Sequence, residues 1–297
     1  MDNLLKLVEK AEKGGVALGH FNISDSVALR AIFEAAKELG VPVIIGTSEG
    51  EAGFLGRNIA ASMVQRLRND YEFPIFLNSD HTHSLDEVKK AVEAGYDAII
   101  FDASKLSFEE NIKQTKEAVE YIKSKSETIL VEGELGYLGD SSKILKSMPS
   151  GVSVKSEDLT KPEEAAQFVK ETKIDLFAPA VGNMHGILMG TGDSGEIKSI
   201  KKRLNIERIA AIKSAVNVPL VLHGGSETAD EDFVAAIEAG VSIIHINTEI
   251  RVAWKNALEG SLEQNGDEVA PYKILKPSME SVKSVVKSRL QLFNKLV

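Results

Sequence analysis

The sequence predicts an α/β fold, a (β/α)8 TIM barrel with an additional C-terminal helix, and three observations support this prediction. Apolar runs alternate with helical patterns along almost the whole chain of 297 residues. The runs are nearly continuous in Val, Ile, Leu, Phe and Ala, which is typical of parallel strands covered on both faces. The first run leads into HFNISD, residues 20–25, without the glycine pattern of a doubly wound nucleotide-binding sheet. We therefore expect residues 1–297 to form a single barrel domain.

Eight predicted strands follow one another along the chain, and each ends in polar residues. Gly or Pro stands at most junctions that lead from a helix into a strand, as at Gly40, Pro74, Gly95 and Pro219. The predicted strands span residues 16–22, 42–48, 74–81, 97–104, 128–135, 176–183, 219–226 and 242–249.

Amphipathic patterns between these strands predict the connecting helices, over residues 25–39, about 57–69, 85–95, 108–125 and 229–240. Residues 277–297 add a terminal helix beyond the eighth unit, which either caps the barrel or contacts another subunit. Residues 136–163 form a long polar loop, which is either a lid over the site or a plain surface excursion.

The composition argues against several kinds of protein. No cysteine occurs, which rules out disulfides, thiolate metal sites and cysteine nucleophiles, and fits a reducing compartment. Residues 1–20 interleave charges with apolar residues at helical spacing, and this is neither a signal peptide nor a membrane span. The net charge of −9 argues against nucleic acid as a partner, although local backbone donors can still bind a small phosphorylated ligand. We expect a cytoplasmic protein with no membrane partner.

The histidines gather at the predicted strand ends, where a barrel of this kind places its chemistry. All six lie there: His20, His81, His83, His185, His223 and His245. Imidazoles without thiolates indicate a catalytic zinc with open positions for substrate, and His81, His185 and His223 follow strands that face a common mouth. His83 competes with His81, because positions two apart share one face of a strand. Acidic residues at the same rim are candidate metal ligands, hydrogen-bond partners of the ligands, or acid/base groups.

The loops after the last two strands predict a phosphate site. His223-Gly224-Gly225-Ser226 and Asn247-Thr248 occupy the positions where barrels commonly bind phosphate. Glycines there let backbone N–H groups approach an oxyanion, and the hydroxyls of Ser226 and Thr248 add donors.

Six motifs together resemble the class II, metal-dependent ketose-bisphosphate aldolases, a family that includes fructose- and tagatose-bisphosphate aldolases. The resemblance runs from Phe21 to about Trp254, most of the chain. The shared order and spacing of the motifs make it more specific than any one of them. They are SDHTHS (79–84), FDASKLSFEEN (101–111), VEGELGYLG (131–139), VGNMHG (181–186), LVLHGGS (220–226) and INTE (246–249).

The resemblance implies a role for each matching residue. His81, His185 and His223 would be zinc ligands, and Asp80 would be the acid/base that handles the aldehyde oxygen. Asp102 and Glu134 match carboxylates that bind a second or alternative divalent metal, and Gly182 is a candidate neighbour of a monovalent cation. His83 then becomes a candidate partner of the ligands. The substrate and phosphate would be bound by Asn22, Gly186, Gly224, Gly225, Ser226, His245, Asn247 and Thr248. We expect a phosphorylated sugar as substrate and a homodimer or homotetramer.

Three positions depart from the family pattern. Gly139-Asp140-Ser141-Ser142 stands where a Gly-Gly-Glu usually supplies a proton-transferring glutamate, and Asp140 is the candidate substitute. His245 replaces an asparagine that contacts substrate, and a bulky ring that titrates near neutral pH predicts an altered substrate or pH dependence. Glu227 stands where glycine is common and would repel a phosphate unless it points away or pairs with a cation such as Arg251. We interpret Glu227 as an acid that starts the helix over residues 229–240.

The leading hypothesis is a zinc-dependent aldolase that acts on a ketose phosphate or bisphosphate. The alternative is a catalytically silent barrel that binds a sugar phosphate or a metal, and a third candidate is another metal-dependent enzyme on the same scaffold. A Schiff-base aldolase would need a buried lysine inside the barrel. The sixth predicted strand has no lysine, and Lys105 is expected in a solvated turn, so a covalent mechanism is the weaker hypothesis.

Overall fold

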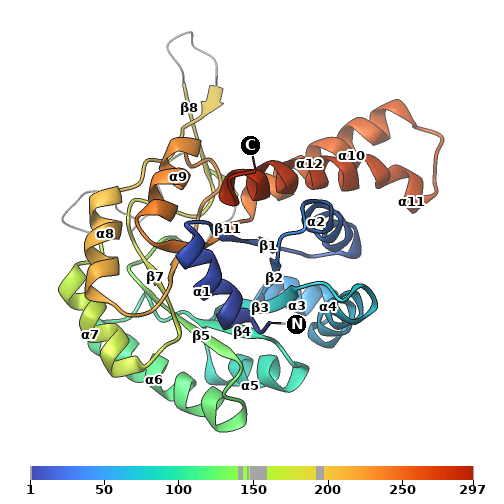
Figure 1. The fold of residues 1–297 in the computed structure, drawn as a ribbon. Helices are drawn as coiled ribbons and strands as arrows, with labels where there is room; N and C mark the ends of the chain where they lie inside the picture. Colours follow the sequence, from blue (N-terminus) through green and yellow to red (C-terminus); the bar gives the residue numbers. More distant parts are fainter. Residues whose placement is uncertain (1, 140–142, 146, 148–158, 192–196, 297) are drawn as a thin grey trace.

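Eight parallel strands close into a barrel, as the sequence predicts (Figure 1). The computed structural model describes residues 2–139, 143–145, 147, 159–191 and 197–296. Each barrel strand lies within a predicted strand range, except that the third ends one residue beyond its range, at Thr82, and the eighth begins one residue before its range, at Val241. In order around the barrel they are β1 (Leu18–Asn22), β2 (Val43–Ser48), β3 (Ile75–Thr82), β4 (Ala98–Phe101), β5 (Leu130–Leu135), β7 (Leu176–Pro179), β10 (Leu220–Leu222) and β11 (Val241–Ile246), which pairs with β1.

Helices between the strands form the outer layer, and several begin and end as the sequence indicates. The side chains of Asp25, Ser84 and Ser107 accept hydrogen bonds from first-turn backbone N–H groups, while Gly40 and Gly95 end helices in the left-handed conformation. The helices of this layer up to the last barrel strand are α2 (Ser26–Leu39), α3 (Glu49–Leu55), α4 (Arg57–Tyr71), α5 (Leu85–Ala94), α6 (Phe108–Lys125), α7 (Pro162–Thr172), α8 (Ile206–Ala215) and α9 (Asp230–Glu238).

An N-terminal helix, α1 (Leu4–Gly14), closes the amino-terminal end of the barrel. Leu4, Val8 and Ala11 on one face of this helix are buried and join a separate apolar cluster inside the barrel. The barrel contributes one or more residues from each strand to this cluster, namely Leu18, Ile44, Phe76, Ala98, Leu130, Leu176, Ala178, Val221 and Ile243. Because this end is filled with apolar side chains, polar chemistry is left to the opposite, carboxyl-terminal end.

The predicted terminal helix is present as α12 (Lys276–Phe293). It runs beside α10 (Thr248–Gln264), and the two project from the barrel as an arm with the short α11 (Pro271–Ile274) at its far end (Figure 1). The carboxyl-terminal half of α12 buries Val286, Leu290 and Phe293 in the main core, against α2 and β1. This half therefore belongs to the outer layer of the barrel, and the expected subunit contact stays a prediction for the projecting arm.

A small three-stranded sheet that the sequence did not predict lies outside the barrel, and it consists of β6 (Ile144–Leu145), β8 (Ile187–Thr191) and β9 (Ile197–Ser199). The predicted sixth strand also ends earlier than expected, at Pro179, and the chain then turns through Gly182 with φ of 101°. Most of the loop over residues 136–163, including Asp140, lies outside the described residues. Within the described part of the chain, no helix is long and apolar enough to cross a membrane.

The packing of α12 predicts that it is required for the stability of the barrel. Leu290 is fully buried, and its Cδ2 lies only 2.8 Å from the position that a Cβ on Gly19 would take. Leu290→Ala should lower the free energy of unfolding by about 2–5 kcal/mol, as measured by urea denaturation. The matched control is Leu296→Ala, which truncates a side chain in the same terminal segment that is 48% exposed. Equal effects of the two substitutions would contradict this account of the domain.

Candidate metal centre and active site

A cavity of about 390 Å³ opens at the carboxyl-terminal end of the barrel. Most of the residues that the sequence singled out line this cavity: Asn22, Asp80, His81, Asp102, His185, Gly186, His223, Gly224, Ser226, His245, Asn247 and Thr248. Glu134 lies beneath it, in contact with His81 and His223. Gly225 does not line the cavity, because its N–H donates to the His245 carbonyl at 3.1 Å and its Cα packs closely against β11.

Three imidazoles meet at the centre of the cavity. The ring of His81 lies 4.7 Å from that of His185 and 4.9 Å from that of His223, between centroids. One ligand atom from each of these side chains lies within 4.8 Å of the others, as a shared metal ion requires. Burial, and then the neighbouring His81 and His223, hold the pKa of His185 well below its ordinary value. His185 is therefore neutral at pH 7 and free to donate a lone pair.

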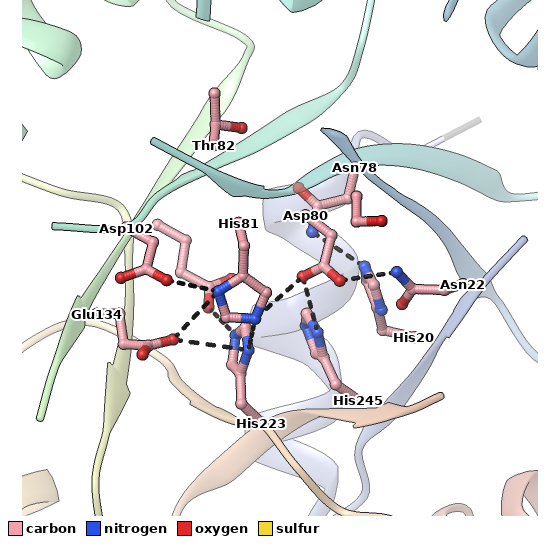
Figure 2. A network of polar contacts seen from close by, with 12 residues as sticks. His20, Asn22, Asn78, Asp80, His81, Thr82, Asp102, Glu134, His223 and His245 are labelled. Carbon is pink, nitrogen blue, oxygen red and sulfur yellow. Dashed lines mark hydrogen bonds and ion pairs between the residues drawn. The ribbon is translucent and has the colours of Figure 1, made fainter. Parts of the chain in front are cut away.

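Carboxylates fix the orientation of the other two imidazoles. Asp102 Oδ2 lies 2.8 Å from His81 Nδ1, and Glu132 Oε1 lies 2.6 Å from His223 Nε2. The proton on each of these nitrogens is thus held by a carboxylate, which leaves His81 Nε2 and His223 Nδ1 facing each other at 3.2 Å (Figure 2). Two lone pairs so close repel unless a proton or a metal ion lies between them. Burial opposes the charged forms, but Asp80 and Asp102 raise the pKa of His81 well above its ordinary value and Glu132 raises the pKa of His223, so a proton takes this place when no metal ion is bound. The arrangement therefore fits a divalent metal ion.

Glu132 was among the acidic residues at the rim whose individual roles the sequence left open, and it lies two residues before Glu134 on the same strand. Residues two apart on a strand share a face, so both glutamates point into the barrel. This alternation is the feature of the sequence that could have predicted a place for Glu132 in the site. Burial, and then the nearby Asp102 carboxylate, raise the pKa of Glu134 to about 8. Its Oε2 is buried and has no hydrogen-bond partner among the described residues. His81, Asp102 and Glu134 form a second group that a metal ion could bind.

An irregularity in the backbone of β3 points the side chains of neighbouring residues in different directions. The pairing of β3 with β4 changes register between Ser79 and Thr82, and His81 adopts φ of 50°, which is rare for a residue with a side chain. This irregularity turns His81 toward His185 and His223. His83 lies at the rim with its side chain 48% exposed, and its Nδ1 is 3.0 Å from the carbonyl oxygen of Asp102. The structure thus places His81, and not His83, in the candidate ligand group.

Asp80 is buried beside the three imidazoles, with Oδ2 accepting a hydrogen bond of 2.7 Å from Asn22 Nδ2 (Figure 2). Burial by itself would raise the pKa of Asp80. The positive charge that His81 can carry outweighs burial, with help from His245 and His20, and holds this pKa well below its ordinary value. Asp80 is therefore ionised at pH 7. A buried carboxylate next to a metal site is equipped to accept a proton from a bound hydroxyl group.

A stack of imidazoles lines the wall behind Asp80. The rings of His20 and His245 lie 3.5 Å apart at 5°, and His245 stacks on His223 at 4.0 Å. His20 fits because β2 carries Gly46 beside it, where a Cβ would lie 2.2 Å from the His20 ring. One possible ligand atom from each of His20, Asp80 and His245 also lies within 4.8 Å of the others. Parallel rings at this separation cannot direct their in-plane lone pairs at one ion, so we regard the stack as a wall of the cavity.

The structure corrects the expectation that His245 titrates near neutral pH. Burial, followed by the neighbouring His20 and His223, lowers the pKa of His245 well below its ordinary value. His245 is therefore neutral at pH 7, and its effect on the site is one of size and shape.

The opposite side of the cavity offers backbone donors. Helix α10 begins at Thr248, its cap residue Asn247 makes no side-chain capping bond, and both residues line the cavity. The N–H of Glu249 in this first turn donates to Ser226 Oγ at 3.2 Å. Gly186, Gly224 and Ser226 line the same side. Positive φ values of 85° at Gly186 and 60° at Gly224 show backbone turns that side chains would strain. This combination suits an anion.

Glu227 does not face this anion-binding side. Its carboxylate accepts a hydrogen bond of 2.8 Å from Ser199 and lies 3.0 Å from Lys201 Nζ. The expectation that Glu227 starts the following helix is wrong, because α9 begins at Asp230 and Glu227 lies in the preceding turn with φ of 61°. The alternative partner, Arg251, forms an ion pair with Glu51. Glu227 therefore does not oppose an anion in the cavity.

Comparisons with known proteins identify the family. The model of the class-II fructose-bisphosphate aldolase family matches residues 2–296. The chain belongs to this family. It is 32% identical to a fructose-bisphosphate aldolase of Staphylococcus aureus over 294 residues, which cover 98% of this chain and 96% of the relative. A fructose-bisphosphate aldolase of Geobacillus stearothermophilus is also 32% identical, with the same coverage.

Solved structures agree with this assignment. The YdjI aldolase from Escherichia coli K12 superposes with a TM-score of 0.79 at 28% identity and covers 99% of this chain and 97% of its own. A putative fructose-1,6-bisphosphate aldolase from Coccidioides immitis has a TM-score of 0.79 at 25% identity, covering 98% of this chain and 96% of its own. The resemblance inferred from the motifs is thus confirmed, and the protein is a class II aldolase, a carbon–carbon lyase.

The geometry around β3 predicts different effects for two histidine substitutions. His81→Ala should abolish tight zinc binding, because it removes a lone pair from the central group. His83→Ala should leave zinc bound at one equivalent, since His83 contacts a backbone carbonyl at the rim. Zinc content after dialysis, measured by mass spectrometry, tests both. Loss of zinc in His83→Ala with retention in His81→Ala would reverse the assignment.

Proposed function

We propose that this aldolase uses zinc to cleave a ketose phosphate or bisphosphate reversibly into dihydroxyacetone phosphate and an aldehyde. The observation that supports the proposal is that three features lie together in one cavity. These are a group of imidazoles with facing lone pairs, an ionised buried carboxylate, and a helix N-terminus that suits an anion. His81, His185 and His223 are the proposed zinc ligands, and imidazole-only sites with an open position are typical of catalytic zinc.

A zinc ion at these histidines would supply Lewis-acid stabilisation of the negative charge that develops on the ketone oxygen. The proposed role of Asp80 is proton transfer at the aldehyde oxygen. In the cleavage direction its carboxylate accepts the proton of the substrate hydroxyl next to the breaking bond. The electron pair of the O–H bond becomes the second bond of the aldehyde C=O, and the electron pair of the C–C bond passes to the enediolate. In the condensation direction the protonated Asp80 returns the proton.

Phosphate recognition is assigned to the other side of the cavity, by Gly186, Gly224, Ser226, Asn247 and Thr248. Helix α10 contributes its N-terminal N–H groups, which favour a negative charge. Gly225 supports this loop by close packing against β11 rather than through its N–H. Asn22 is proposed to hold Asp80, because its Nδ2 donates to both Asp80 and Glu51. Asp102 and Glu134 are proposed ligands of a second or alternative divalent ion with His81.

The remaining expectations are kept as proposals. Exposed apolar residues on the arm support a homodimer or homotetramer, since Val269 is 84% exposed and Tyr272 is 76% exposed. A cytoplasmic location rests on the absence of cysteine. A monovalent cation near Gly182 also stays a proposal.

Activity of the zinc-loaded protein on fructose 1,6-bisphosphate and other ketose phosphates is the test of this function. Triose-phosphate release should disappear with a chelator and return when zinc is added. Asp80→Asn should lower kcat by about 10²–10⁴-fold with zinc still bound, because the amide cannot accept the proton. Bound zinc without turnover of any ketose phosphate would favour a catalytically silent barrel instead.

The histidine stack predicts a change in substrate choice when it is opened. His245→Asn removes a ring that is stacked between His20 and His223, so the cavity gains room near Asp80. The ratio of kcat/KM values among ketose phosphates should change, while the pH profile should not, because His245 is already neutral. Identical kcat/KM ratios in the wild type and the variant would show that His245 does not select substrate.

A further inference from the structure

A buried lysine lies behind the proposed phosphate site. Lys202 is in the segment between β9 and α8, is only 7% exposed, and does not line the cavity. Its Nζ donates hydrogen bonds to the carbonyl oxygens of Met184, at 2.6 Å, and Gly224, at 2.8 Å. Met184 adjoins His185, and Gly224 adjoins His223. The ammonium therefore joins the two loops that carry two of the proposed zinc ligands.

This ammonium lacks a direct counter-ion in the described part of the chain, where both of its hydrogen bonds go to neutral carbonyls. Burial lowers the pKa of Lys202 to about 7, although the more distant carboxylates of Glu249 and Glu227 favour the charged form. Burying a charge without an ion-pair partner is costly, and two carbonyl dipoles offset only part of the cost. An anionic ligand bound nearby would offset the rest.

The hydrogen bonds of Lys202 continue through the backbone of both loops. The peptide between Met184 and His185 accepts from Lys202 and donates through the His185 N–H to Leu138. The peptide between Gly224 and Gly225 accepts from Lys202 and donates through the Gly225 N–H to His245. Such chains of hydrogen bonds polarise and stiffen one another. One cation thus fixes the backbone on which Gly186, Gly224 and Ser226 line the anion-binding side.

We propose that Lys202 is a built-in monovalent cation of the phosphate site, which positions its two loops and supplies positive charge for the substrate phosphate. Two carbonyl oxygens around a single positive charge are the surroundings that a potassium ion or an ammonium ion would accept. A covalent role is not consistent with the geometry, because the amine is held by two carbonyls and lies outside the cavity lining. The inference rests on the proposed function, since it takes this side of the cavity to bind phosphate.

Binding of inorganic phosphate and of dihydroxyacetone phosphate to the zinc-loaded full chain, measured by calorimetry, tests the inference. Lys202→Met keeps the apolar length of the side chain and removes the charge, and it should weaken both affinities by about tenfold to a hundredfold. The matched control is Lys201→Met, because Lys201 is the adjacent lysine, is 54% exposed and pairs with Glu227 at the surface. Wild-type affinity in the control and zinc content near one equivalent in both variants would show that the loss is local.

Chemical rescue separates the charge of Lys202 from its bulk. Lys202→Ala leaves the two carbonyls facing a void, so ammonium or potassium ions should restore phosphate affinity, whereas tetramethylammonium at the same ionic strength should not. Loss of affinity without rescue would overturn the cation role and leave Lys202 as a structural tie. Unchanged affinity in Lys202→Met would also overturn it. Failure of the wild type to bind either phosphate would instead overturn the proposed phosphate site itself.

Discussion

Closure of the barrel between β1 and β11 is the constraint on which the site depends. This pairing sets His20 directly beside His245. It also brings together the first and last strands, since Leu18 pairs with Ile243 although the two residues are far apart in the chain. Because all eight strands are parallel, their carboxyl ends reach one rim. The imidazoles of His81 on β3 and of His185 and His223 in the loops after β7 and β10 can then meet. The apolar cluster sealed by α1 fills the other end and leaves this rim as the polar one.

The site divides into two electrostatic halves. Glu132, Glu134 and Asp102 surround the imidazoles on one side, where Asp102 and Glu132 hold the outer nitrogens of His81 and His223. Helix α10 and the buried Lys202 lie on the other side, where donors and a positive charge meet. The net charge of −9 therefore does not argue against an anionic ligand at this site, because burial makes local charges count for more than distant ones.

The departures from the family pattern act in different ways once they are placed in three dimensions. Glu227 is harmless to an anion, since it turns toward Ser199 and Lys201. His245 belongs to a stack that depends on Gly46 and fills the wall behind Asp80, so it changes the shape of the cavity. Lys202 is absent from every motif, because the segment that carries it is neither a strand end nor a glycine turn.

The order of apolar runs by itself determined the barrel, since burial on both faces leaves a continuous apolar pattern that local reading detects. It also determined that the histidines share one rim, because parallel strand ends must meet. Alternation alone left His81 and His83 equivalent and the family resemblance favoured His81; only the tertiary structure shows why their side chains diverge, since local alternation does not predict the irregularity in β3. The tertiary structure alone also shows that His223 pairs with Glu132, that the Glu227 side chain points toward Ser199, and that Lys202 is buried. Each depends on contacts between residues distant in the chain, which no local pattern encodes.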